Sequence, residues 1–270
     1  MQRVRLVLSY DGTAYRGSQI QPGVATIQET LECALRKIRA YGGRTTFAGR
    51  TDAGVHAFGQ VVSCDVVWER ELRRLSHGLN SVLPSDVRVL RCEAADPDFS
   101  ARFDALSREY RYRLVTSRDV PPSLGRLAWA REGELDTGLM AEASSKLLGT
   151  HSFGSFASSG KSRALSRSEL RRHLFDCDWR PLQCDFFPTR TGAGIYELRV
   201  RANGFLPQMV RNIVSALVEV GSGNKSPEWI EYLLVSGDRR LLGPPAPPHG
   251  LFLWHVEYAG DSDTHTGNTG

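Results

Sequence analysis

Apolar and polar positions alternate in several short stretches of this chain, and between them apolar positions recur at helical spacing. Residues 4–10, "VRLVLSY", are rich in β-branched residues and end in the turn signal "DGT", so they predict a strand. Ile27 and Leu31 begin a helical face that follows it, and Thr26 with Glu29 three residues later has the pattern of an N-cap. We therefore expect the chain to open with a strand and a helix.

The same two periodicities continue along the chain in two groups of elements. They predict, in order, strand 60–67, helix 69–83, strand 86–95, strand 108–116, helix 136–148, strands near 169–178 and 194–202, helices 206–220 and 227–235, and strand 251–258. This order indicates an α+β protein with two halves, 1–105 and 106–259. The polar tail 260–270 is expected to be disordered.

Strand 108–116 carries different residues on its two faces. Tyr110 and Tyr112 share one face, and Arg111 and Arg113 share the other, because successive side chains of a strand alternate. One face of this strand is therefore aromatic and the other is cationic.

The composition is that of an ordinary globular protein with a slight excess of positive charge. The 270 residues are 41% hydrophobic and 24% charged, and 34 Lys plus Arg against 30 Asp plus Glu give a net charge of +4. This charge permits a polyanionic partner but is too small to argue for one. Arginine is concentrated in 35–39, 107–113 and 161–173, where it either forms basic patches or lies on solvated helix faces.

The cysteines and the amino terminus limit the class of protein. The five cysteines form no C-x-x-C pair, so neither a zinc site nor a disulfide framework is indicated, and a reducing cytoplasm is expected. Arg5 interrupts the first apolar run too early for a signal peptide, and no stretch has membrane-spanning length. We expect a soluble cytoplasmic protein without a metal or a membrane partner.

The segment "AGRTDAGVHAFGQ", residues 48–60, is the strongest candidate for a chemical site. Three glycines allow close backbone approach around Arg50, Asp52 and His56. Taken alone, Asp52 is either a turn or cap residue or a reactive carboxylate. His56 has no further ligand cluster near it in the sequence, so a packed, hydrogen-bonded imidazole is expected rather than a metal ligand.

Several sequence blocks together resemble one family, the bacterial tRNA pseudouridine synthase A family. The blocks are "YDGTAYRG" at 10–17, G-R-T-D-x-G-V-H-A at 49–57, "LNSVLPSDVRV" at 79–89, A-R-F at 101–103, Y-x-Y at 110–112 and M-V-R-N-I-V at 209–214. They stand in the family's order and extend over nearly the whole chain, from residue 4 to about 258.

The resemblance implies a fold and an activity. The fold would be two ferredoxin-like α/β halves joined into one mainly antiparallel sheet, with helices on one face and a central active-site cleft. The activity would be isomerisation of uridine to pseudouridine in the anticodon stem-loop, at tRNA positions 38 to 40, without a cofactor. The family also implies a homodimer that binds tRNA.

The resemblance also implies the roles of individual residues. Asp52 would be the catalytic nucleophile, attacking either ribose C1′ or uracil C6, or promoting elimination to a glycal. Arg211 lies in an otherwise apolar helix, so it either extends its guanidinium to solvent or needs an anionic partner, which the resemblance identifies as Asp52. Tyr110 would stack on the extruded uracil and take part in proton transfer. The substrate-binding set that the resemblance implies is Arg50, Arg102 and Tyr110 from these blocks and Phe205 from the longer similar stretch 203–221.

Two positions depart from the family pattern, and two rival functions remain open. Ser18 and Ile20 stand where the family has Trp and Arg, which predicts an altered RNA-facing surface and leaves the choice of uridine open. A non-catalytic RNA-binding module would use the same aromatic and basic residues. A glycoside hydrolase would need a second carboxylate, and no matching block supplies one.

Overall fold

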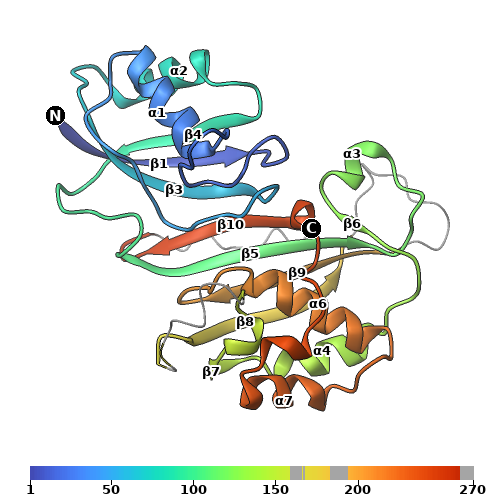
Figure 1. Ribbon diagram of the computed structural model, residues 1–270. Coiled ribbons are helices and arrows are strands. Elements are labelled where there is room, and N and C mark those ends of the chain that lie inside the picture. Colours follow the sequence, from blue (N-terminus) through green and yellow to red (C-terminus); the bar gives the residue numbers. More distant parts are fainter. Residues whose placement is uncertain (159–165, 167, 183–193, 262–270) are drawn as a thin grey trace.

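The computed structural model describes residues 1–158, 166, 168–182 and 194–261, and it contains one large sheet flanked by helices (Figure 1). The sheet has ten strands in the order β4-β1-β3-β10-β5-β9-β8-β7, with β2 paired to β3 and β6 paired to β5. The strands are β1 (Gln2–Tyr10), β2 (Thr46–Phe47), β3 (His56–Val66), β4 (Val87–Ala94), β5 (Ala105–Val115), β6 (Trp129–Ala130), β7 (Gly149–Ser152), β8 (Arg171–Pro181), β9 (Ile195–Ala202) and β10 (Leu251–Tyr258).

The α-helices come from both halves of the chain. They are α1 (Ile27–Lys37), α2 (Leu72–Val82), α3 (Pro122–Gly125), α4 (Thr137–Ser145), α6 (Met209–Gly221) and α7 (Glu228–Ser236). Figure 1 shows α1 and α2 beside β1 and β4, and α4, α6 and α7 beside the strands of the other half. The predicted α+β class and the mainly antiparallel sheet are confirmed.

The two halves meet at the pairing of β3 with β10. This pairing is parallel, with Phe252 opposite His56 and Leu253 opposite Ala57, whereas β10 pairs antiparallel with β5. The last strand of the chain therefore lies between the first half and β5, and it makes the sheet continuous. Residues near His56 and residues of β5 are thereby separated by only one strand.

One face of the sheet carries the apolar core. Leu6 and Leu8 of β1 and Leu31 of α1 are fully buried in the same cluster as Tyr112 of β5 and Ile213 of α6. Burial of each such side chain contributes about 1.5–3 kcal/mol, so this face accounts for most of the packing between the sheet and the helices. The alternation predicted for β1 and β5 is confirmed.

The local signals for helix ends are largely correct. Thr26 is the N-cap of α1, and its hydroxyl accepts a hydrogen bond from the Glu29 N–H at 3.4 Å. Helix α6 begins at Met209, later than the predicted residue 206, because Gln208 before it adopts a left-handed conformation with φ of 61°. Strand β3 begins at His56, earlier than the predicted residue 60, because a bulge interrupts its alternation.

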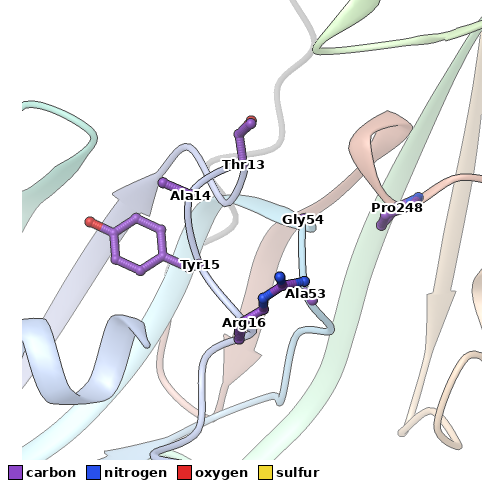
Figure 2. Close-up of a pocket in the computed structure, with 7 residues that line it drawn as sticks. All are labelled: Thr13, Ala14, Tyr15, Arg16, Ala53, Gly54 and Pro248. Carbon is purple, nitrogen blue, oxygen red and sulfur yellow. The ribbon is translucent and has the colours of Figure 1, made fainter. Parts of the chain in front are cut away.

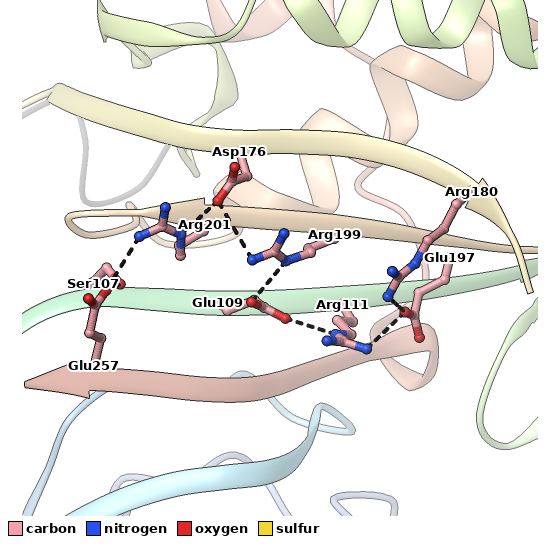
Figure 3. Close-up of polar contacts among 9 residues, drawn as sticks. All are labelled: Ser107, Glu109, Arg111, Asp176, Arg180, Glu197, Arg199, Arg201 and Glu257. Atoms are coloured by element: carbon pink, nitrogen blue, oxygen red, sulfur yellow. Dashed lines mark hydrogen bonds and ion pairs between the residues drawn. The ribbon is translucent and has the colours of Figure 1, made fainter. Parts of the chain in front are cut away.

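The opposite face of the sheet carries a network of ion pairs across β5, β8, β9 and β10 (Figure 3). Glu109 accepts hydrogen bonds from Arg111 at 2.8 Å and Arg199 at 3.0 Å, and its side chain is 1% exposed. Glu197 is equally buried, and Arg111 and Arg180 lie 3.2 and 3.0 Å from it. The arginines at 107–113 therefore do not form the free basic patch that their clustering allowed. Arg111 and Arg113 pair with Glu109 and Glu197, and the Arg108 guanidinium donates to backbone carbonyls.

The carboxyl-terminal tail is attached to the sheet where it begins. Asp261 pairs with Arg5 at 2.6 Å, so the predicted disordered tail is anchored at its first residues, and 262–270 lie outside the described residues. The arginine cluster at 161–173 lies partly outside them as well. Within the described ranges, no helix is long and apolar enough to cross a membrane.

Candidate active site

The segment that carries Asp52 connects β2 to β3, and a buried glutamine holds its first part. The side-chain amide of Gln60 donates to the carbonyl of Gly49 at 2.8 Å, and the Gly49 N–H donates to the same amide's oxygen at 3.3 Å. Gln60 is fully buried, so both of its polar atoms depend on these contacts. The amide therefore fixes the backbone three residues before Asp52.

A second set of hydrogen bonds fixes the residue next to Asp52. The hydroxyls of Tyr10 and Thr51 lie 2.8 Å apart, and the Thr51 N–H donates to the hydroxyl of Ser18 at 2.9 Å. Burial raises the pKa of Tyr10 to about 12, so its hydroxyl keeps its proton at neutral pH. Gly54, with φ of 76°, completes the turn after Asp52.

Asp52 forms an ion pair with Arg211 from the first turn of α6. Arg211 Nη1 lies 3.2 Å from Asp52 Oδ2, and the Arg211 Nε–H donates to the carbonyl of Ala246 at 2.7 Å. The arginine side chain is 12% exposed and the Asp52 side chain is 41% exposed, so the carboxylate has one side open to solvent. The predicted partnership of Asp52 and Arg211, which are 159 residues apart in sequence, is confirmed as a contact.

Tyr110 lies beside this ion pair in the central strand β5. A Cβ added at Gly49 would lie 3.4 Å from the Tyr110 hydroxyl oxygen, so the phenol lies directly against this part of the Asp52 segment. The ring of Phe205 meets the Tyr110 ring edge-on at a centroid distance of 5.0 Å. Burial raises the pKa of Tyr110, and the negative charge of Asp52 raises it further, so the phenol is protonated at neutral pH.

Tyr112 has a different environment from Tyr110. It is fully buried, and its hydroxyl donates to the carbonyl of Pro247 at 2.9 Å. Tyr112 is therefore a structural aromatic residue of the core.

Two arginines of the expected substrate-binding set lie on the surface. Arg50 is exposed and makes no ion pair or hydrogen bond among the described residues. Arg102 is also exposed, and its guanidinium lies over the ring of Phe103 at 5.2 Å. Phe103 is 77% exposed, a large aromatic surface that the sequence did not single out.

The expected site residues fall into a central group and a peripheral one. The structure brings Asp52, Tyr110, Phe205 and Arg211 together. Within the described ranges, Arg102 has no hydrogen bond or ion pair to any of these four side chains. The central group is therefore the candidate for the chemistry, and Arg102 lies outside it.

The structure corrects the interpretation of Ser18. Its side chain is 1% exposed, its hydroxyl accepts from the Thr51 N–H, and its own N–H donates to the Thr51 carbonyl at 3.0 Å. The residue therefore supports the Asp52 segment from inside and does not form part of an RNA-facing surface. Ile20 is partly exposed, so only this second departure alters the surface.

His56 is a packed residue, as predicted. Its Nδ1 accepts from the Gly12 N–H at 3.1 Å, and its Nε2–H donates to the Arg126 carbonyl at 3.1 Å. Its ring stacks on Phe252 at 4.8 Å. Burial lowers its pKa, which favours the neutral imidazole that this pattern requires. In the part of the chain that the structure describes, no group of three or more His, Cys, Asp or Glu side chains has a metal-binding arrangement.

A pocket of about 450 Å³ opens beside the Asp52 segment (Figure 2). It lies between the loop after β1 and the two residues that follow Asp52. Its lining consists of Thr13, Ala14, Tyr15, Arg16, Ala53, Gly54 and Pro248. The block "YDGTAYRG" matched the family in sequence, but nothing in it indicated that Arg16 lines a pocket beside Asp52.

Comparisons with known proteins point to one family. The sequence profile of a family described as tRNA pseudouridine synthase matches residues 6–104 and 143–259. The chain is 38% identical to a Bacillus pumilus protein named tRNA pseudouridine synthase A, over 95% of this chain and 99% of that one.

Further relatives carry the same name. The identity is 36% to the Bacillus subtilis protein, over 95% of this chain and 99% of that one. It is 40% to a Vibrio vulnificus protein, over 97% of this chain and 94% of that one. A profile that covers both halves and relatives that match along nearly their whole length show that this chain belongs to the tRNA pseudouridine synthase family.

Proposed function

We propose that this protein converts uridine to pseudouridine in the anticodon stem-loop of tRNA, at positions 38 to 40. The observation that carries the proposal is the half-exposed carboxylate of Asp52, paired with Arg211 and placed beside the ring of Tyr110 in a chain of this family. The reaction breaks the bond from C1′ to N1 and forms one from C1′ to C5, so it needs no oxidant or reductant. The protein would work in the cytoplasm on its tRNA substrate.

Asp52 is proposed as the catalytic group that divides the exchange of the C1′ to N1 bond for a C1′ to C5 bond into easier steps. A carboxylate nucleophile can attack C1′ as uracil leaves, or attack C6, and a carboxylate base can instead promote elimination to a glycal. Each route needs a correctly oriented carboxylate, and the ion pair with Arg211 supports this requirement. The backbone clamps at Gly49 and Thr51 limit the movement of Asp52 relative to a bound ribose.

Tyr110 and Phe205 are proposed to form the wall against which the target uracil stacks. A uridine in a stem or stacked loop must first be extruded, at a cost of about a few kcal/mol, and stacking on an aromatic ring offsets part of it. Because the phenol of Tyr110 is protonated at neutral pH, it is suited to donate a hydrogen bond and to relay a proton. Removal of the C5 proton is assigned to a base, for which the Asp52 carboxylate is the candidate.

Arg50 and Arg102 are proposed to contact RNA outside the reacting atoms. Arg50 precedes Asp52 by two residues and has a free guanidinium among the described residues, which suits a phosphate or the space left by the extruded base. Arg102 with the exposed ring of Phe103 offers a stacking and phosphate-binding surface at the start of β5. Arg102 is therefore proposed as a peripheral contact.

The rival functions differ from this proposal in measurable ways. A glycoside hydrolase-like enzyme is disfavoured because the family and the relatives are pseudouridine synthases. A non-catalytic RNA-binding module would bind tRNA without releasing the C5 hydrogen. Tritium release from tRNA labelled at C5 of uridine distinguishes the two, because forming the C1′ to C5 bond requires loss of that hydrogen.

Whole tRNA is expected to be a better substrate than an isolated anticodon stem-loop. A cleft that serves several adjacent uridines in tRNAs of different sequence cannot depend on base edges alone, so phosphate contacts over the body should position the substrate. We predict that kcat/KM for tritium release falls about tenfold or more when the body is removed. Chemical mapping of pseudouridine reports the position in both substrates, and equal rates on the two would contradict docking through the body.

The chain is also proposed to form a homodimer through the sheet face opposite the helices. Phe58 is 54% exposed and stacks on Trp254 at 4.8 Å, and Arg111 lies 4.1 Å above the Trp254 ring. Phe175, 40% exposed, lies under Arg201 on the same network. Aromatic residues and arginines are enriched in protein interfaces. The paired charges of this face suit a second copy of the chain better than a polyanion.

Substitution of both exposed phenylalanines tests the dimer. We predict that the double variant Phe58→Glu, Phe175→Glu dimerises about tenfold or more weakly in sedimentation equilibrium, because it places charges in the apolar part of the contact. Val235→Glu is the control, since Val235 is 74% exposed on α7 among the helices. A monomeric wild type would refute the dimer itself, and a double variant that dimerises like wild type would refute only this face.

The two halves are proposed to act as structural units that close the site between them. The boundary at residues 105 and 106 coincides with the start of β5. Asp52 comes from the half 1–105, whereas Tyr110 and Arg211 come from the half 106–259, so neither half contains the complete site.

A further inference from the structure

The pocket beside Asp52 is lined by residues other than the Asp52 and Arg211 of the ion pair. Its lining includes Ala53 and Gly54, which directly follow Asp52, but neither Tyr110 nor Arg211 (Figure 2). The pocket and the ion pair therefore border the same short segment but have no residue in common. A group bound in the pocket would lie close to the reacting nucleotide but would not be the reacting base. It would therefore be a neighbour of the target uridine along the RNA strand.

The loop that supplies Arg16 is fixed on both sides of it. The Arg16 N–H donates to the Ala25 carbonyl at 2.9 Å, and the Tyr15 hydroxyl donates to Asp86 at 2.8 Å. The Tyr15 carbonyl also accepts from the Gly54 N–H at 3.3 Å, which joins the loop to the Asp52 segment. The base of the Arg16 side chain is therefore held at a defined place relative to Asp52.

The guanidinium of Arg16 is available to a ligand. Arg16 is exposed, and its side chain makes no hydrogen bond or ion pair among the described residues. In the same loop, Oδ1 of Asp11 accepts from the N–H and the hydroxyl of Thr13 at 2.9 and 2.6 Å, and among the described residues no ion pair joins Asp11 to Arg16. An arginine that is anchored at its backbone and free at its donors is suited to bind a phosphate in a bidentate manner.

The rest of the lining argues for recognition of the RNA backbone and not of a base. Besides Arg16, the pocket offers small residues, a proline, the threonine hydroxyl and a tyrosine. Among the described residues that line it, there is no Asn, Gln, Asp or Glu side chain that would read a base edge. One cation among small side chains matches a phosphodiester and its ribose. A contact of this kind is independent of sequence.

We propose that this pocket binds a phosphodiester adjacent to the target uridine and that Arg16 contacts its phosphate. The proposal rests on the proposed function for the presence of an RNA substrate. It assigns Arg16 to positioning of the strand and not to the chemical step. A backbone contact next to the reactive carboxylate sets which nucleotide faces Asp52 without selecting a base.

A combined change of protein and RNA tests the contact. Wild type and Arg16→Gln are titrated with stem-loops that carry a neutral methylphosphonate at the phosphate 5′ or 3′ of the target uridine, and binding is followed by fluorescence anisotropy. On unmodified RNA we expect Arg16→Gln to bind about three- to tenfold more weakly, with the salt slope reduced in magnitude by about 1. With one of the two methylphosphonate stem-loops, Arg16→Gln should bind only slightly more weakly than wild type, since the neutral linkage has already removed the contact with Arg16.

Two control measurements distinguish a specific Arg16–phosphate contact from a general effect of lost positive charge and from an effect on the chemical step. Arg240→Gln removes the same charge at an exposed residue that pairs with Asp238, and it should leave binding unchanged. In tritium release, Arg16→Gln should raise KM and leave kcat within about twofold.

Three outcomes decide between the proposals. The pocket proposal is overturned if neither neutral linkage couples to Arg16, or if Arg16→Gln lowers kcat with unchanged binding. Binding that behaves as expected while wild type releases no tritium would overturn the proposed reaction and leave the pocket proposal intact.

Discussion

Asp52→Asn is expected to abolish turnover while tRNA binding stays within a few-fold of wild type. The amide keeps the shape of the carboxylate but is neither a nucleophile nor a base, so tritium release should fall by more than about 10³-fold. The side chain is 41% exposed, and the backbone clamps at Gly49 and Thr51 do not use it, so the fold should be unaffected. Single-turnover tritium release and anisotropy with the same tRNA measure the two quantities.

The control for Asp52→Asn is to verify that residue 52 is still an asparagine during the assay. An asparagine can deamidate to aspartate, so mass spectrometry of the assayed sample must exclude recovery of the carboxylate. Turnover at a few per cent of wild type by protein that still carries the amide would remove Asp52 from the nucleophile role. If the variant loses both tRNA binding and turnover, Asp52 instead supports the RNA-binding site.

Arg211→Met is expected to lower kcat/KM by about 100-fold, because the Asp52 carboxylate loses the group that orients it. The wild-type guanidinium contacts two partners at once, Asp52 through Nη1 and the Ala246 carbonyl through Nε. Met fills a similar volume in α6 but leaves the carbonyl without its donor, at a cost of about 1 kcal/mol of folding free energy. Thermal unfolding should therefore show a modest change, far smaller than the change in activity.

Arg211→Lys is the matched variant for this ion pair. A lysine keeps a positive charge near Asp52, but its single ammonium group cannot reproduce the planar fork of donors, so about tenfold loss is expected. The ordering wild type, Lys, Met in kcat/KM is the diagnostic result. A Met variant as active as wild type would show that the ion pair has no part in catalysis, and equal losses for Lys and Met would show that charge alone is not what Arg211 contributes.

The sequence alone determined the local elements of this protein. Strand β1, helix α1 and strand β5 follow from alternation, helical spacing and an N-cap, all of which are interactions between residues close in sequence. The short strands β2, β6 and β7 were missed because so few residues carry no periodicity, and they form only where a neighbouring strand supplies hydrogen bonds.

The sequence also indicated the candidate site, through the blocks that resemble the family. It identified Asp52, Tyr110 and Arg211 and the partnership of Asp52 with Arg211. It did not reveal that Ser18 is buried against Thr51, because a substitution on a loop says nothing about which way the side chain points.

Only the tertiary structure decided what depends on long-range pairing. The parallel contact of β3 with β10 places β3, which follows the Asp52 segment, one strand away from β5, which carries Tyr110. No local pattern encodes which distant strands pair. Arg111 and Arg113 are neutralised by Glu109 and Glu197, which an arginine count could not show. Arg16 and Ala53 line one pocket for the same reason, because chain segments far apart in sequence come into contact only in the folded protein.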